Sequence, residues 1–185
     1  MATSTSSTAD TQLAQRRWSS WRRGLTLAAA ALVLGGLVAL GWFWRHPNLF
    51  PASDPGGMGS QVAAGRHVWF GAVQAPTQGD PRTLTLDSAQ PVMATAPADT
   101  QITVAVCHGH PIGTAYRLRP WCTSTEPVPG AHFRIGAGAT DQIVVRVASD
   151  HPGKVVIHGL RLNYSAGWQV GDETTGMKLV ADFTK

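Results

Sequence analysis

The sequence lacks the residue patterns of the common catalytic sites. It contains neither G-x-S-x-G nor H-E-x-x-H, which mark a nucleophilic serine and a zinc-dependent hydrolase. The glycine-rich run GGMGS, residues 56–60, is not followed by the G-K-[ST] that would hold phosphate groups. Asp172 and Glu173 are adjacent, and adjacent side chains of an extended segment point to opposite faces, so they form a poor acid-base pair. We therefore expect no enzymatic activity.

Charged residues are also absent from residues 24–44, a run of 21 residues. A helix of that length is about 31 Å long, which matches the hydrocarbon core of a bilayer. Four arginines lie just before the run, and only Arg45 lies just after it. By the positive-inside rule, we expect a single-pass transmembrane helix with a cytoplasmic N-terminus and an extracytoplasmic C-terminal domain. Four tryptophans lie near its two ends, where indole rings favour the headgroup layers: Trp18, Trp21, Trp42 and Trp44.

A cleaved signal peptide is the alternative for this apolar run. Its hydrophobic region would be about 7 to 15 residues long and would be followed by small residues at the cleavage site. The run observed is longer and ends in the bulky sequence W-F-W, which favours an uncleaved signal anchor. Small residues recur every four positions on one side of the helix, where another helix could approach closely. Ala31, Gly35 and Ala39 are therefore candidates for helix packing, and a simple anchor is the alternative that the abundance of Ala and Gly in such helices favours.

The net charge of +4 is concentrated at the N-terminus. Residues 1–44 carry four arginines and one aspartate, whereas residues 45–185 carry eleven lysines and arginines against ten aspartates and glutamates. Membrane topology explains this excess, so we expect no nucleic-acid partner. Residues 1–23 are expected to form a disordered, basic cytoplasmic segment.

The composition changes twice after the apolar run. Residues 45–65 are rich in Pro, Gly, Ala and Ser, and are expected to form a flexible stalk. Residues 66–185 alternate short β-prone runs with turn residues and show no helical period. In QITVAV (residues 101–106) and DQIVVRVAS (residues 141–149), apolar residues occupy alternate positions. We expect an all-β ectodomain over residues 66–185, an antiparallel β-sandwich that is immunoglobulin-like in general architecture, with a barrel as the alternative.

One expected strand, residues 154–165, changes the phase of its apolar residues. They fall at odd positions up to Ile157 and at even positions from Leu160 onward. Without a correction, such a slip would turn half of them toward water. We expect a bulge at His158-Gly159, because glycine is the usual bulge residue; two short strands with a break are the alternative.

The chain has only two cysteines, Cys107 and Cys122. In an oxidising compartment two cysteines usually pair, and closing this loop would stabilise the fold by about 3 kcal/mol. The alternative is an extracytoplasmic copper or zinc module that uses His108 and His110. The loop contains no methionine and no further Cys-His pair, and a disulfide would remove the thiolates. We therefore expect a disulfide, with no metal and no cofactor.

The same loop interleaves aromatic and basic residues in YRLRPW, residues 116–121. An extended segment places Arg117 and Arg119 on one face, where they could meet a partner carboxylate or an anionic lipid headgroup. Tyr116, Arg117, Arg119 and Trp121 are therefore the candidates for partner binding. The alternative, which such segments more often represent, is a solvated polar face above Trp121, which would then serve packing.

The segment GKVVIHGLRLNYSAGWQVGDETTG, residues 153–176, resembles the end of uncharacterised actinobacterial membrane-anchored proteins. Those proteins have one N-terminal helix, a cysteine pair and a glycine-spaced final pattern, which is matched here by Gly159, Leu160, Leu162, Tyr164, Gly167, Gly171 and Gly176. The resemblance implies a single-pass protein with an extracytoplasmic β-sandwich-like domain, and it implies no activity. We expect a non-enzymatic accessory protein of the cell envelope that binds or supports a protein partner.

Overall fold

The computed structural model describes residues 28–29, 31–50 and 56–185. The chain divides into two compact units, one that ends at Arg45 and one from His46 to Lys185. In the first unit, residues 31–45 are helical. Among the described residues, none of the helices has the length and apolar character needed to cross a membrane. The expected cytoplasmic segment, residues 1–23, and the start of the expected apolar helix, residues 24–27, lie outside the described part.

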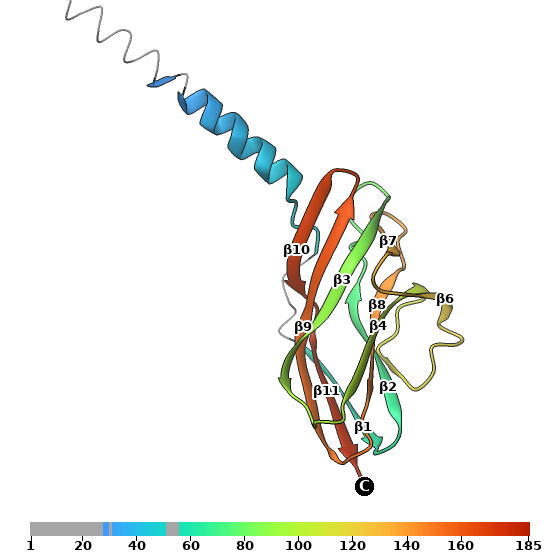
Figure 1. The fold of residues 1–185 in the computed structure, drawn as a ribbon. Coiled ribbons are helices and arrows are strands. Elements are labelled where there is room, and N and C mark those ends of the chain that lie inside the picture. The colour runs from blue at the N-terminus through green and yellow to red at the C-terminus, as the bar shows by residue number, and fades with distance from the viewer. Residues whose placement is uncertain (1–27, 30, 51–55) are drawn as a thin grey trace, which may run out of the picture. The chain divides into compact units, whose positions relative to one another are not determined.

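The second unit consists of two β-sheets that lie face to face (Figure 1). Sheet A has the strand order β1-β11-β9-β3-β7, with β10 also paired to β9, and sheet B has the order β5-β2-β8-β4-β6. The strands are β1 (Gly57–Ala63), β2 (His67–Gln74), β3 (Arg82–Thr95), β4 (Gln101–Gly109), β5 (Thr114–Ala115), β6 (Cys122–Pro127), β7 (Ala131–Ile135), β8 (Gln142–Ala148), β9 (Gly153–Ala166), β10 (Gln169–Thr175) and β11 (Lys178–Thr184). This confirms the expected all-β sandwich.

One hydrophobic core fills the space between the sheets. Strand β8 contributes the alternating residues Ile143, Val145 and Val147, all essentially inaccessible to solvent. Strand β9 faces them from sheet A with buried residues that include Leu162 and Tyr164. The apolar alternation of the sequence therefore marks the inward faces of these strands.

Strand β1 corrects two expectations. It pairs with β11 in parallel, so the sandwich is not wholly antiparallel. It also lies inside residues 45–65, the expected flexible stalk, in which Phe50 and Val62 are both buried in the core. The folded unit therefore begins at His46 instead of Arg66. Its glycine-rich composition concealed the strand, because ladder pairing uses backbone groups that glycine supplies as well as other residues do.

The phase change in β9 is absorbed by a bulge, as predicted. Pro91 of β3 lies opposite Leu160, and two residues later Met93 lies opposite Ile157, so β9 carries one extra residue at His158-Gly159. Apolar side chains on both sides of the bulge consequently point into the core. The bulge also marks a change of neighbour: β11 pairs with the first part of β9, and β10 pairs with the second part.

We predict that Gly159→Ala lowers the free energy of unfolding by about 1–3 kcal/mol. Gly159 has a φ of 134°, and a Cβ there would lie 2.7 Å from the carbonyl oxygen of Thr175. Gly59→Ala is the matched control, because a Cβ at Gly59 meets no atom closer than 3.8 Å. Urea unfolding of the full-length protein in micelles measures the difference. Equal midpoints for the two variants would contradict this account of the bulge.

Candidate functional site

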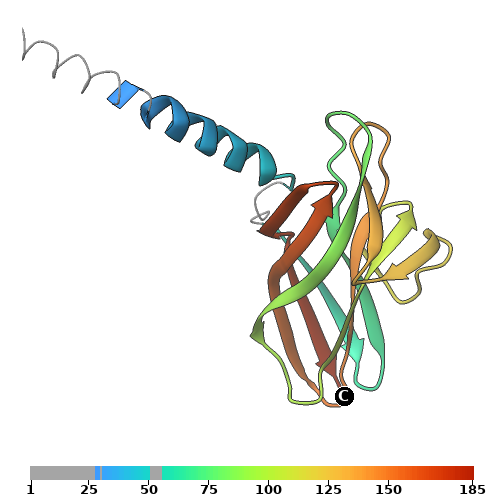
Figure 2. The same ribbon diagram turned by 45° about the horizontal axis from the view of Figure 1, so that its top comes forward.

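The loop between β4 and β6, residues 110–121, folds over the outer face of sheet B. The disulfide between Cys107 and Cys122 closes it, with the Cα atoms 5.3 Å apart, which confirms the expected bond. Beneath it lies a second hydrophobic cluster, formed by Ala105, Cys107, Ile112, Cys122 and Val144 with Trp69, Ala115 and Leu118 packed against them. We call this segment the cysteine loop. Figure 2 shows it in yellow-green, beside β4 and β6.

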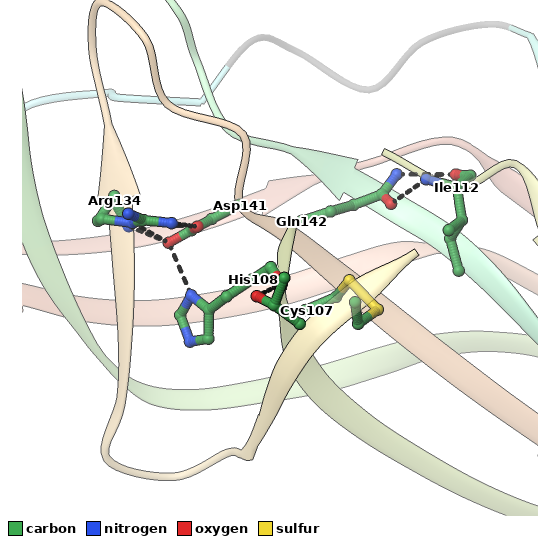
Figure 3. Close-up of a disulfide and its surroundings, with 8 residues drawn as sticks. Cys107, His108, Ile112, Arg134, Asp141 and Gln142 are labelled. Atoms are coloured by element: carbon green, nitrogen blue, oxygen red, sulfur yellow. Dashed lines mark hydrogen bonds and ion pairs between the residues drawn. A yellow bond between two sulfur atoms is a disulfide. The ribbon is translucent and has the colours of Figure 1, made fainter. Parts of the chain in front are cut away.

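A buried glutamine fixes the backbone of the cysteine loop (Figure 3). The side-chain amide of Gln142, on β8, accepts a hydrogen bond from Ile112 N at 2.8 Å and donates one to Ile112 O at 3.0 Å. Gly71 of β2 makes room for this arrangement, since a Cβ there would lie 2.1 Å from both the Gln142 amide nitrogen and Ile112 O. Gly71 N also donates to Gly113 O. The loop is therefore tied to two strands of sheet B besides the disulfide.

The four residues predicted to bind a partner all lie on the exposed side of this loop. Tyr116 is 57% exposed and Trp121 is 48% exposed. Arg117 and Arg119 are exposed as well, and within the described part of the chain neither forms an ion pair with a carboxylate. The Tyr116 hydroxyl donates to the Gln61 carbonyl oxygen on β1 at 3.2 Å. Two aromatic rings and two unneutralised cations are thus presented together.

His108, near the end of β4, belongs to a polar cluster that links the two sheets. Asp141 is buried; its carboxylate lies 2.6 Å from the Arg134 guanidinium and 3.1 Å from His108 Nδ1 (Figure 3). Burial alone would raise the pKa of Asp141, but hydrogen bonds from Arg134 and His108 outweigh it and hold that pKa below its usual value. The buried His108 Nε2 lies 3.4 Å from Glu126 Oε1, without hydrogen-bond geometry. The cluster joins β7 of sheet A to β4 and β6 of sheet B.

The two histidines of the metal alternative have different environments. His108 is turned toward Asp141, whereas His110 is exposed and follows Gly109, where the register of β4 against β6 shifts. Both cysteines are in the disulfide. Over residues 28–29, 31–50 and 56–185, no three or more His, Cys, Asp or Glu side chains are grouped so as to hold a metal ion. The contact of His108 with Asp141, which also pairs with Arg134 of β7, gives His108 a role in joining the sheets.

The helix-packing residues lie on the described helix. Ala31, Gly35 and Ala39 are exposed there, and a Cβ at Gly35 would meet no atom within 4 Å.

No protein-family model, no curated protein and no solved structure matches this chain.

Sequence reasoning missed Gln142 and Gly71, which hold the cysteine loop in place. One signal was present: Val144 lies between the inward-facing residues of β8 and is itself fully buried. An apolar residue on each face of a strand indicates that both faces are covered. Only the fold shows which segment covers the outer face and which glutamine binds that segment.

We predict that Gln142→Leu loosens the cysteine loop while the sandwich stays folded. The change leaves Ile112 N and O without partners, which costs about 1–3 kcal/mol for each buried group. Trypsin should then cut faster after Arg117, and mass spectrometry quantifies that cleavage. Gln101→Leu, at an exposed position on β4, should leave the rate unchanged. A wild-type rate for Gln142→Leu would show that the disulfide alone orders the loop.

We also predict that Asp141→Asn lowers stability at neutral pH by about 1–3 kcal/mol, because the hydrogen bonds from Arg134 and His108 lose a charged acceptor. Since the folded-state pKa of Asp141 is lowered, its stabilisation is present above the ordinary carboxyl pKa near 3.9 and is lost as the pH falls below it. The gap between the wild type and the variant should therefore close in acid. Unfolding curves from pH 7 to pH 3 measure the gap, with Asp87→Asn, an exposed carboxylate on β3, as the control. A gap that is independent of pH would contradict the assignment.

Proposed function

We propose that this chain is a single-pass, membrane-anchored protein of the cell envelope, whose extracytoplasmic β-domain binds a protein partner through the cysteine loop. The proposal makes it a non-enzymatic accessory protein, located at the cell membrane with its N-terminus in the cytoplasm. The two packed sheets support an architecture that is immunoglobulin-like in general terms, but the disulfide joins the neighbouring strands β4 and β6 of sheet B and does not connect the two sheets. The uncharged run over residues 24–44 and the arginines before it support the anchor.

The presentation of Tyr116, Arg117, Arg119 and Trp121 on an ordered backbone carries this proposal. Exposed aromatic side chains cost little conformational entropy on binding when their backbone is already held, as it is here by the disulfide and Gln142. Tryptophan, tyrosine and arginine are also the residues that most often dominate binding energy at protein interfaces. The loop therefore has both the composition and the rigidity of a recognition surface.

Charge indicates the kind of partner. No aspartate or glutamate occurs between Asp99 and Glu126, although the ectodomain as a whole is nearly balanced in charge. Arg117 and Arg119 add two exposed positive charges within this stretch. A partner surface with carboxylates would complement them and would speed encounter at low ionic strength. The helix, with Ala31, Gly35 and Ala39 on one side, offers a second place where a membrane partner could pack.

We predict that a photo-crosslinking amino acid at position 116 captures a distinct protein in the native membrane. Capture should fall at least tenfold in the double variant Arg117→Glu, Arg119→Glu, because like charges then oppose an acidic partner. The double variant Lys154→Glu, Lys185→Glu changes the charge equally at exposed positions on β9 and at the C-terminus, and should capture normally. Immunoblotting of the crosslinked band measures both. Equal capture by the two double variants would contradict partner binding through the loop.

A further inference from the structure

The residues that follow the helix are bound tightly into the β-domain. The Glu173 carboxylate, on β10, accepts hydrogen bonds from Leu49 N at 2.8 Å and from Phe50 N at 3.2 Å. The Tyr164 hydroxyl, on β9, lies 2.8 Å from the Pro47 carbonyl oxygen and also contacts Glu173. Two side chains thus hold the backbone of residues 47–50. We call Tyr164 and Glu173 the clamp.

Phe50 completes this attachment by entering the hydrophobic core. Its ring packs against Phe133 of β7, with the centroids 5.8 Å apart, and against Tyr164 in an edge contact at 5.4 Å. Burial and the neighbouring Glu173 raise the pKa of Tyr164, so its hydroxyl stays protonated at physiological pH. Removing residues 47–50 would leave a hydrophobic gap where Phe50 lies and would take from Glu173 and Tyr164 the part-buried hydrogen bonds that they make to this segment.

Glycine spacing in the C-terminal segment makes the clamp possible. Gly171 of β10 lies opposite Tyr164 of β9, and a Cβ at Gly171 would fall 2.0 Å from the tyrosine ring. The ring can therefore lie across β10 and reach residues 47–50. Gly167, with a φ of 62°, forms the turn that follows. The pattern noticed in the sequence thus builds both the clamp and the β9–β10 hairpin.

The stretch of chain between the helix and the clamp is short. Only His46 separates the last helical residue, Arg45, from the clamped Pro47. Two residues of extended chain reach at most about 7 Å. If residues 24–44 cross the membrane, the clamp lies close to the membrane surface. Trp168, four residues after Tyr164 at the hairpin turn, is 54% exposed and lies about 10 Å further along the strands.

We propose that the tip of the β9–β10 hairpin rests on the lipid headgroup layer, with Trp168 inserted among the headgroups. This inference rests on the membrane anchor of the proposed function and goes beyond it, because it identifies a lipid-binding surface distinct from the cysteine loop. An indole ring has an apolar body and a polar N–H, which suits it to the boundary between hydrocarbon and water. The clamp holds the tip at that boundary, so insertion requires little further ordering.

Tryptophan fluorescence of the full-length protein tests the proposal. The protein is reconstituted in phosphatidylcholine vesicles, with and without bromine atoms near the headgroup end of the acyl chains. The quantity measured is the emission intensity with bromine divided by the intensity without bromine. Bromine quenches only nearby indoles, so Trp168→Phe removes a quenched emitter and should raise the ratio above the wild-type value. Trp121→Phe, in the cysteine loop, removes an unquenched emitter and should lower it. No rise for Trp168→Phe overturns the proposal and leaves a protein partner as the occupant of the tip.

A second pair of variants tests the role of the clamp. Glu173→Gln removes the charged acceptor that holds residues 49 and 50 and should reduce the Trp168 contribution to quenching at least twofold. Asp172→Asn is the matched control, because Asp172 is the neighbour of Glu173 on β10 and pairs with Arg161 instead. If the Trp168 contribution is unchanged in Glu173→Gln, the clamp does not hold the hairpin tip at the headgroup layer.

Alkaline carbonate extraction separates the two proposals. Release of the chain into the supernatant contradicts the membrane anchor, whereas a retained chain with unquenched Trp168 contradicts this inference alone.

Discussion

The extra residue at His158-Gly159 is the constraint on which the rest of sheet A depends. It keeps apolar side chains on both parts of β9 directed into the core, and it lets the strand exchange β11 for β10 as its neighbour. Tyr164 faces inward only because the phase was corrected before it. The clamp and the β9–β10 hairpin therefore depend on this local irregularity.

The cysteine loop combines a structural role with an exposed surface. Its inner side covers Val144 and Ala105 on the outer face of sheet B, which would otherwise be open to water. Its outer side carries the aromatic and basic residues proposed to bind a partner. The inner and outer sides belong to the same backbone. The two hydrogen bonds between Gln142 and Ile112 that hold the inner side against sheet B therefore also order the outer side. Under the proposed function, stability and recognition are thus coupled in one segment.

The two proposed surfaces belong to different sheets. The cysteine loop is attached to β2, β4, β6 and β8 of sheet B, and the hairpin tip is formed by β9 and β10 of sheet A. A domain held at its hairpin to the bilayer could still offer the cysteine loop to a neighbouring protein. The clamp holds residues 47–50 against β9 and β10, where the composition had predicted a flexible stalk.

Local patterns in the sequence were sufficient for several features. Alternation marks the inward faces of β4 and β8, and the phase change predicts the bulge, because strand periodicity is a property of neighbouring residues. The pairing of Cys107 with Cys122 follows from there being only two cysteines. The uncharged run over residues 24–44 likewise needs no tertiary information to be recognised.

Contacts between distant residues were decided only by the tertiary structure. Glu173 binds residues 49 and 50, which are more than 120 residues away in the sequence, and Gln142 binds Ile112, which is 30 residues away. No local sequence pattern predicts either of these contacts. Strand β1 was hidden because glycine-rich composition resembles a linker, although the backbone pairs with β11 regardless of side chain. Sequence periodicity reports which face of a strand is apolar, whereas the identity of what covers that face depends on how the whole chain closes on itself.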